Sequence, residues 1–180
     1  MSFTEFWIKL CRPEDAPRLA PLIQALALEE GVEPAEIDEI ENIVSALLQS
    51  GASDFLLATA GDEAIGCMQI AYRLSTWEAT PYAYIEDFYL APQARGRGVG
   101  TKLLDYALQR AEGQNASHIA LDVRNANTAA QRLYTRFGFS NSQSSLWKRP
   151  LPLGESYCDT TTTLAAIDER RGTAGTGESA

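Results

Sequence analysis

The sequence predicts one domain of the mixed α/β (α+β) class over residues 1–150. Two kinds of apolar pattern alternate along this part of the chain: short runs typical of strands, and longer stretches in which apolar residues recur at helical spacing. A glycine-rich segment, residues 95–101, joins a strong strand pattern to a helical one. The length of 180 residues allows one domain with a hydrophobic core and leaves too little chain for two large ones.

The N-terminal part is expected to form a strand followed by two helices. Apolar residues alternate over 6–10, which predicts the strand, and recur at helical spacing over 19–26 and 37–47, which predicts the helices. Pro21 lies inside the first helical stretch, and because proline lacks an amide donor we expect a kink or a restart there. The second helix is expected to end near Ser50-Gly51, since glycine readily adopts the left-handed conformation that follows many helices.

The middle of the chain predicts three strands. The apolar run over 54–59 and the segment 65–74 are separated by the turn-like Gly61-Asp62-Glu63, which indicates a hairpin. Aromatic and β-branched residues over 82–90 predict a third strand. The Ala91-Pro92 step that follows is expected to end it, because proline cannot donate to a strand ladder.

After the glycine-rich segment, the chain predicts a helix, a strand and a second helix. Helical spacing of apolar residues places the first helix over about 99–112, and alternation places the strand over 119–123. Asn127 or Thr128 is expected to cap the second helix, because the side chains of both residues accept hydrogen bonds from the free amides of a first turn. Gly138 is expected to end it.

The C-terminal end of the chain has a different composition. A last short strand is expected over 145–148. Beyond Pro150, the sequence is rich in threonine and glycine and cannot bury enough apolar surface to offset the entropy of ordering the chain. Residues 151–180 are therefore predicted to form a flexible tail after the domain.

Composition and charge disfavour several classes of partner and site. Fifteen Lys and Arg residues against 24 Asp and Glu give a net charge of −9, which disfavours nucleic acid and anionic lipid as partners. No uninterrupted stretch approaches the roughly 20 apolar residues of a membrane span, and residues 1–12 lack a signal-peptide pattern, so a cytoplasmic location is expected. The three widely spaced cysteines and the single histidine, His118, predict reduced thiols and no metal site.

The segment Arg95-Gly96-Arg97-Gly98-Val99-Gly100-Thr101 is the strongest candidate for a binding site. Glycines let a backbone approach a ligand closely, and the helix that follows presents free amides and the positive end of its dipole, which suits a pyrophosphate. The phosphate-binding loop of nucleotide hydrolases fits poorly, since it needs Gly-Lys-Ser or Gly-Lys-Thr where this chain has Gly100-Thr101-Lys102. The dinucleotide fingerprint needs two residues between its last glycines, where this chain has one.

A second motif gives the region a family resemblance. Asn127 is followed by a helix that contains Ala130 and Leu133-Tyr134, and then by Phe137-Gly138-Phe139. Together with the glycine-rich segment after the strand end Phe88-Tyr89-Leu90, this arrangement resembles the GNAT superfamily of N-acetyltransferases, whose acetyl-CoA loop follows the pattern Gln/Arg-x-x-Gly-x-Gly/Ala. The sequence from Glu86 to Phe88 is similar to the spermidine/spermine (polyamine) acetyltransferase branch.

The resemblance implies a fold and a cofactor. The fold is a mixed, mostly antiparallel central sheet with helices on both faces, whose fourth and fifth strands splay apart to admit the pantetheine arm of coenzyme A. Acetyl-CoA is the implied cofactor: amides of the glycine-rich segment would hold its pyrophosphate, the strand end would pair with pantetheine, and the Leu90 amide would point at the thioester oxygen. The residues assigned to it are Phe88, Tyr89, Leu90, Arg95, Gly96, Arg97, Gly98, Val99, Gly100, Thr101, Asn127, Ala130 and Tyr134.

The resemblance also implies the groups that move protons. Acetyl transfer to an amine needs a neutral nucleophile and a proton for the departing thiolate. Tyr134 stands in the family position for the acid, and a phenol with an ordinary pKa of about 10 keeps its proton at neutral pH. Glu86 is favoured as the base, directly or through water, with Asp87 or no side-chain base as the alternatives. On a regular strand these two acids point to opposite faces, so at most one is expected in the cleft.

The acceptor is expected to be a small primary amine, such as a polyamine or diamine. The acceptor-binding segments of the superfamily supply acidic and aromatic residues that would hold a cation by charge and by ring faces: Glu29, Glu30, Trp77, Glu78, Tyr82 and Glu86. Acetylation of a protein amino terminus or lysine is a second hypothesis, and a cofactor-binding module without turnover is a third. Homodimers are common among similar proteins, but no residue pattern in this chain shows an interface.

Overall fold

A computed structural model of the chain describes residues 5–143 and 146. The chain divides after Ser142 into two compact units, and the helices and strands of the described residues belong to the first. The strand expected over 145–148 and the tail expected over 151–180 lie outside the described residues, apart from Leu146. The domain boundary at residue 150 therefore stays a prediction.

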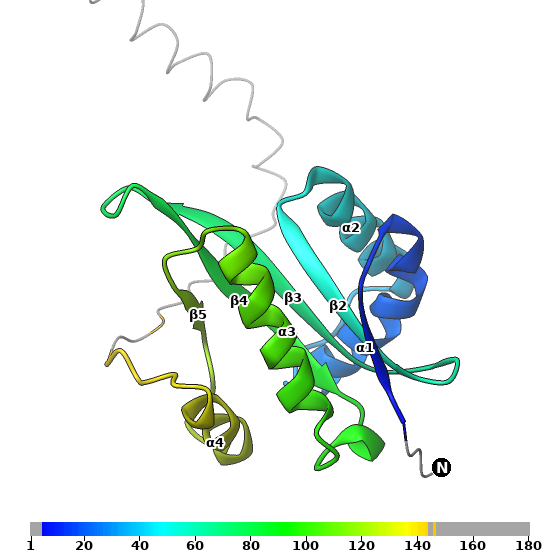
Figure 1. Ribbon diagram of the computed structural model, residues 1–180. Coiled ribbons are helices and arrows are strands. Elements are labelled where there is room, and N and C mark those ends of the chain that lie inside the picture. Colours follow the sequence, from blue (N-terminus) through cyan, green and yellow to red (C-terminus); the bar gives the residue numbers. More distant parts are fainter. Residues whose placement is uncertain (1–4, 144–145, 147–180) are drawn as a thin grey trace, which may run out of the picture. The chain divides into compact units, whose positions relative to one another are not determined.

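Five strands form one sheet in the order β1-β2-β3-β4-β5 (Figure 1). They are β1 (Trp7–Leu10), β2 (Ser53–Ala60), β3 (Glu63–Ser75), β4 (Thr80–Leu90) and β5 (Ile119–Leu121). Successive strands from β1 to β4 pair antiparallel, and β4 pairs with β5 in parallel. The predicted fold class, with a mixed and mostly antiparallel sheet, is confirmed.

Helices cover both faces of the sheet. They are α1 (Ala16–Glu29), α2 (Ile37–Ser50), α3 (Val99–Gly113) and α4 (Thr128–Arg136), with short 3₁₀ turns at Pro13–Asp15 and Pro92–Ala94. The alternation of β2 sets the two faces apart: Phe55 and Leu57 pack with α1 and α2, whereas Leu56 and Ala58 pack with α3 (Figure 1). No helix in the described part of the chain is long and apolar enough to cross a bilayer.

The helices α1 and α2 differ in how well the sequence predicted them. α2 ends as expected, with Gly51 in the left-handed conformation at φ 69°. α1, in contrast, runs without interruption through Pro21, so the restart expected there is not observed. Pro21 lies in the second turn of the helix and removes a single backbone donor. Burial of Leu19 and Leu22 on either side of it holds the helix against the sheet.

The strands β4 and β5 separate halfway along β4. The two strands pair through only three residue pairs, from Ala83↔Ile119 to Ile85↔Leu121. β4 continues for five more residues, Glu86 to Leu90, without β5 beside it. This is the splay that the family resemblance implies, and it leaves one backbone edge of β4 open.

A bulge interrupts β4 where the splay begins. Gln69 of β3 pairs with Asp87 and the next residue, Ile70, pairs with Ile85, so Glu86 has no partner across the ladder. As a result, Ile85 and Phe88 both pack in the α3-side core. The alternation expected for a regular strand is therefore wrong at Glu86, where it would place Phe88 on the face opposite Ile85, whereas Phe88 and Leu90 share a face as expected.

Candidate active site

The glycine-rich turn folds as an anion-binding helix start. Gly96 and Gly98 have φ values of 70° and 83°, which side chains rarely tolerate. Gly98 is the N-cap of α3, and the first helical hydrogen bond runs from Lys102 N to Gly98 O at 3.0 Å. The amides of residues 99–101 therefore have no partner within the helix and carry its positive dipole end.

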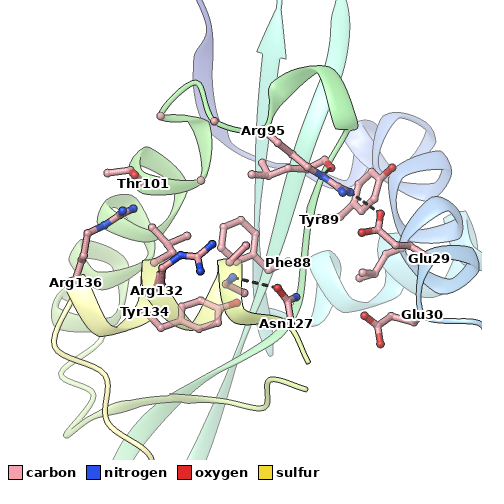
Figure 2. Close-up of a pocket in the computed structure, with 18 residues that line it drawn as sticks. Glu29, Glu30, Phe88, Tyr89, Arg95, Thr101, Asn127, Arg132, Tyr134 and Arg136 are labelled. Atoms are coloured by element: carbon pink, nitrogen blue, oxygen red, sulfur yellow. Dashed lines mark hydrogen bonds and ion pairs between the residues drawn. The ribbon is translucent and has the colours of Figure 1, made fainter. Parts of the chain in front are cut away.

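A cavity of about 530 Å³, which we call the cofactor cavity, opens at this turn (Figure 2). It lies between the C-terminal ends of α1 and β4, the start of α3, and α4. All residues assigned to the cofactor from the sequence line it, except Arg97 and Val99. The Val99 side chain is fully buried in the core beneath α3, so of this residue only the backbone faces the turn.

Two arginines of α4 that were not assigned from the sequence also line the cofactor cavity. They are Arg132 and Arg136, which Figure 2 shows on the side of the cavity opposite Glu29 and Glu30. With Arg95 from the turn, they bring three cationic side chains together in a chain of net charge −9. Their spacing of four residues puts both on one helix face, and this spacing is the sequence signal that would have found them.

The end of α1 is tied by ion pairs to two sides of the cleft. Arg95 Nη2 lies 2.5 Å from Glu29 Oε2, and Arg124 Nε lies 2.5 Å from Glu30 Oε2. Arg95 also donates through Nε to the Leu90 carbonyl at 2.9 Å. Glu29 and Glu30, which the sequence assigned to the acceptor, thus line the cofactor cavity and are paired with arginines.

Gly100 lets the start of α3 lie close to β4 and α4. A Cβ atom at this position would lie 3.1 Å from Leu90 Cδ1 and 3.4 Å from Phe88 Cζ and Leu133 Cδ2. Any larger side chain would push against these three residues, all of which line the cofactor cavity. The cavity, the free amides and the arginines together fit a ligand that carries a pyrophosphate.

The open edge of β4 presents backbone groups to the cofactor cavity. Ala91 donates its amide to the Ile65 carbonyl of β3 at 3.0 Å. Because successive amides of a strand point to opposite edges, the Leu90 amide is directed toward the edge that β5 no longer covers. Phe88 presents its backbone in the same direction, so an extended ligand can pair here as an added strand does.

Tyr134 lies on α4 with its side chain turned into the site. The Asn127 side chain caps this helix by accepting from the Ala130 amide at 3.1 Å, as predicted. The Tyr134 ring is 8% exposed and packs between Phe88 and Phe139, with ring centroids 6.4 Å and 5.7 Å away. Burial raises the pKa of Tyr134 to about 12, so the phenol is protonated at neutral pH.

A second cavity, of about 350 Å³, lies where β4 and β5 separate, and we call it the central cavity. It shares Phe88, Asn127 and Tyr134 with the cofactor cavity. Glu86 and Asp87 both line it. The expectation that at most one of these acids lies in the cleft depended on regular pairing, and the bulge at Glu86 removes that condition.

The two acids of the central cavity have different surroundings. Glu86 forms an ion pair with Arg73, whose guanidinium carbon lies 4.1 Å from the centre of the Tyr84 ring. Asp87 is partly buried, and among the described residues none donates a hydrogen bond to its carboxylate. Burial, and then the charge of Glu86, raise the pKa of Asp87 above its ordinary range.

The structure does not bring Trp77, Glu78 and Tyr82 into either cavity, although the sequence assigned them to the acceptor. Trp77 is 97% exposed in the turn between β3 and β4. Glu78 accepts a hydrogen bond from Ser117 Oγ at 2.8 Å, and the Tyr82 ring stacks on His118 at 5.0 Å. These residues precede or begin β4, whose length at about 3.3 Å per residue separates them from the end that lines the cofactor cavity.

Comparison with known proteins identifies the family. Residues 20–139 match the acetyltransferase (GNAT) family. The chain is 26% identical over 152 residues to aminoglycoside N(6')-acetyltransferase type 1 of Stenotrophomonas maltophilia, covering 83% of this chain and 95% of that protein. It is 33% identical over 94 residues to thialysine N-epsilon-acetyltransferase of Mus musculus, covering 49% and 55% of the two chains.

Solved structures share the fold. An aminoglycoside acetyltransferase from an uncultured soil metagenomic sample superposes with a TM-score of 0.71 at 16% identity, covering 82% of this chain and 97% of that one. Ribosomal-protein-alanine N-acetyltransferase from Brucella melitensis gives a TM-score of 0.66 at 20% identity, covering 81% and 99%. The matched family segment spans both the glycine-rich turn and Tyr134. The chain therefore belongs to the GNAT family of acetyltransferases and is an acyltransferase.

Proposed function

We propose that this protein is an acetyl-CoA-dependent N-acetyltransferase that acts on the primary amine of a small molecule. The observation that carries the proposal is the cofactor cavity, which is lined by the free helix amides of the glycine-rich turn, by Arg95, Arg132 and Arg136, and by Tyr134. The relatives from Stenotrophomonas maltophilia and Mus musculus are N-acetyltransferases of aminoglycosides and of thialysine, both of which are small amines. Their names favour a small-molecule acceptor over a protein one.

The chain's own residues supply what this cofactor requires. The amides of residues 99–101 would hold the pyrophosphate, and Arg132 and Arg136 would neutralise phosphate charge. The open edge of β4 would pair with the pantetheine arm. Acetyl-CoA, when bound, supplies the acetyl group as an activated thioester.

Tyr134 and the Leu90 amide would act at the reacting end of the cavity. The Tyr134 hydroxyl keeps its proton across the physiological range and would donate it to a departing thiolate. The Leu90 amide, which faces the open edge, would stabilise negative charge that develops on a carbonyl oxygen. Both groups are held by packed elements, which preorganises them for this task.

The arginine pair on α4 gives a direct test of cofactor binding. The double variant Arg132→Ala, Arg136→Ala is expected to weaken coenzyme A binding by about 10-fold, or about 1.4 kcal/mol, because two partly exposed phosphate contacts are lost. Calorimetry at two salt concentrations measures the change, and the variant should show the smaller salt dependence. Arg18→Ala is the matched control, since Arg18 donates to the Asp62 carbonyl and does not line the cavity. Equal affinities in all three proteins would contradict the assignment.

The activity itself is tested by incubating the protein with acetyl-CoA and a library of primary amines. Thiol release and a mass increase of the amine by one acetyl group are the expected results. A protein that binds coenzyme A but acetylates no amine would contradict the proposed reaction while leaving cofactor binding in place.

A further inference from the structure

Asp87 lies where two cavities meet. Besides lining the central cavity, it lines a third cavity of about 630 Å³ between α1, α2 and the sheet, which we call the apolar cavity. Ile23 of α1 also lines both. The central cavity in turn shares Tyr134 with the cofactor cavity. The cofactor cavity, the central cavity and the apolar cavity therefore lie next to one another, from the glycine-rich turn past Tyr134 and Asp87 to α2.

Most of the side chains that line the apolar cavity are hydrocarbon: Ile23, Ala35, Ile40, Ile43, Val44, Leu47 and Phe55. Its polar lining residues are Glu39, Asn42, Gln69 and Asp87. Ile43 is 63% exposed although it lines the cavity, and Val32, which lines the central cavity, is 56% exposed. Exposed apolar groups at the mouth of an apolar space favour a ligand that would cover them.

The carboxylates at this site differ in availability. Glu39 lines the apolar cavity, but its side chain accepts from the Glu36 amide in the capping of α2. Glu86 is engaged by Arg73. Asp87 alone of these three has no hydrogen bond or ion pair with a described residue, and its charged neighbour is Glu86, with the Cys67 thiol also close. Asp87 is partly buried, so its carboxylate loses some hydration without gaining a partner, and an incoming cation would relieve that cost.

We propose that Asp87 receives the ammonium group of the acceptor and takes its proton, while the apolar body of the acceptor lies in the apolar cavity. The step is a proton transfer: one N–H bond breaks, an O–H bond forms on the carboxylate, and the electron pair stays on the nitrogen, giving a neutral amine and a neutral carboxyl group. The inference rests on the proposed function. It identifies the acceptor as a primary alkylamine or arylalkylamine, whereas the sequence favoured a polyamine or diamine.

A polyamine fits this site less well than an apolar amine. Its second ammonium group would lie among the aliphatic side chains of the apolar cavity, where a charge without a partner is strongly disfavoured. Of the two carboxylates that line this cavity, Asp87 would bind the first ammonium group, and one oxygen of Glu39 accepts from the Glu36 amide at the start of α2. An alkyl or phenyl group instead makes the free energy of binding more favourable with all of the apolar surface that it covers.

The adjacent acids provide a matched pair of variants. Asp87→Asn is expected to weaken binding of 2-phenylethylamine about 10-fold and to lower kcat/KM about 100-fold, because the proton acceptor is lost. Glu86→Gln is expected to lower kcat/KM less than Asp87→Asn does, because Glu86 is already paired with Arg73. Asp105→Asn is the control that should leave kcat/KM unchanged, since Asp105 pairs with Lys102 and lines none of the three cavities. Calorimetry gives amine and coenzyme A affinities, and melting temperatures check folding. In the wild-type protein, kcat/KM should fall on acidification because Asp87 gains a proton. This fall should be absent in Asp87→Asn.

The acceptor class is tested with hexylamine and 2-phenylethylamine against spermidine. Ile43→Ser is expected to weaken hexylamine binding about 5-fold, whereas Leu74→Ser, an exposed residue outside both cavities, should have no effect. A preference for spermidine, or a loss of activity in Glu86→Gln with activity kept in Asp87→Asn, would overturn the inference. If the wild-type protein failed to bind coenzyme A, the proposed function would fail, while amine binding that depends on Asp87 would still support this site.

Discussion

Replacing Tyr134 with phenylalanine is expected to lower kcat by about 1,000-fold, within the range that a positioned proton donor contributes. The substitution removes one hydroxyl group and keeps the ring that packs between Phe88 and Phe139. Coenzyme A affinity should therefore be unchanged, and the loss should lie in the chemical step. Steady-state kinetics and calorimetry separate the two effects.

The pH dependence gives a second check on Tyr134. An acid works only while it is protonated, and burial raises the pKa of this phenol to about 12. The wild-type protein is thus expected to show no alkaline loss of kcat from this group below about pH 10. Tyr106→Phe is the control, because Tyr106 is a residue of α3 that packs against the core and does not line the cofactor cavity. Full turnover in Tyr134→Phe would remove this residue from the mechanism.

Replacing Gly100 with valine is expected to weaken coenzyme A binding by about 150-fold. A Cβ atom there already lies 3.1 Å from Leu90 Cδ1, closer than ordinary van der Waals contact. The two further methyl groups of valine would displace Leu90, Phe88 and Leu133, which line the cofactor cavity. Overpacking of this kind costs up to about 3 kcal/mol, which corresponds to the stated factor.

Gly113→Val is the control for Gly100→Val. Gly113 lies at the other end of α3, and no atom lies within 4 Å of a Cβ placed there. Calorimetric titration with coenzyme A should show wild-type affinity for this control, and thermal melting checks that both variants are folded. Tight binding by Gly100→Val would mean that the cofactor does not pass this point of the cavity.

The sequence predicts the elements of this fold well because their signals are local. The helical spacing that ends at Gly51 and the Asn127 cap need no information from distant residues, and both are found. Arg132 and Arg136 also carry a local signal, their spacing of four residues, although the glycine-rich segment is the more conspicuous one. The fold and most residues of the cofactor cavity could thus be predicted from the sequence.

The acceptor side of the site was not predictable in the same way. The bulge at Glu86 arises from how β4 pairs with Gln69 and Ile70 of β3, and nothing in the β4 sequence encodes that one-residue shift. Trp77 was assigned by residue type alone, and the length of β4 places it far from Tyr134. Whether Glu86 or Asp87 is the acid without a partner depends on how the strands and helices pack. The spacing of apolar residues in the sequence carries no information on that packing.

The two ion pairs at the end of α1 link events on the two sides of this cleft. Glu29 is paired with Arg95 of the glycine-rich turn and Glu30 with Arg124 after β5, so a movement of the helix end toward one side would stretch the ion pair on the other. By thermodynamic reciprocity, any factor by which a bound acceptor alters cofactor affinity equals the factor by which the cofactor alters acceptor affinity.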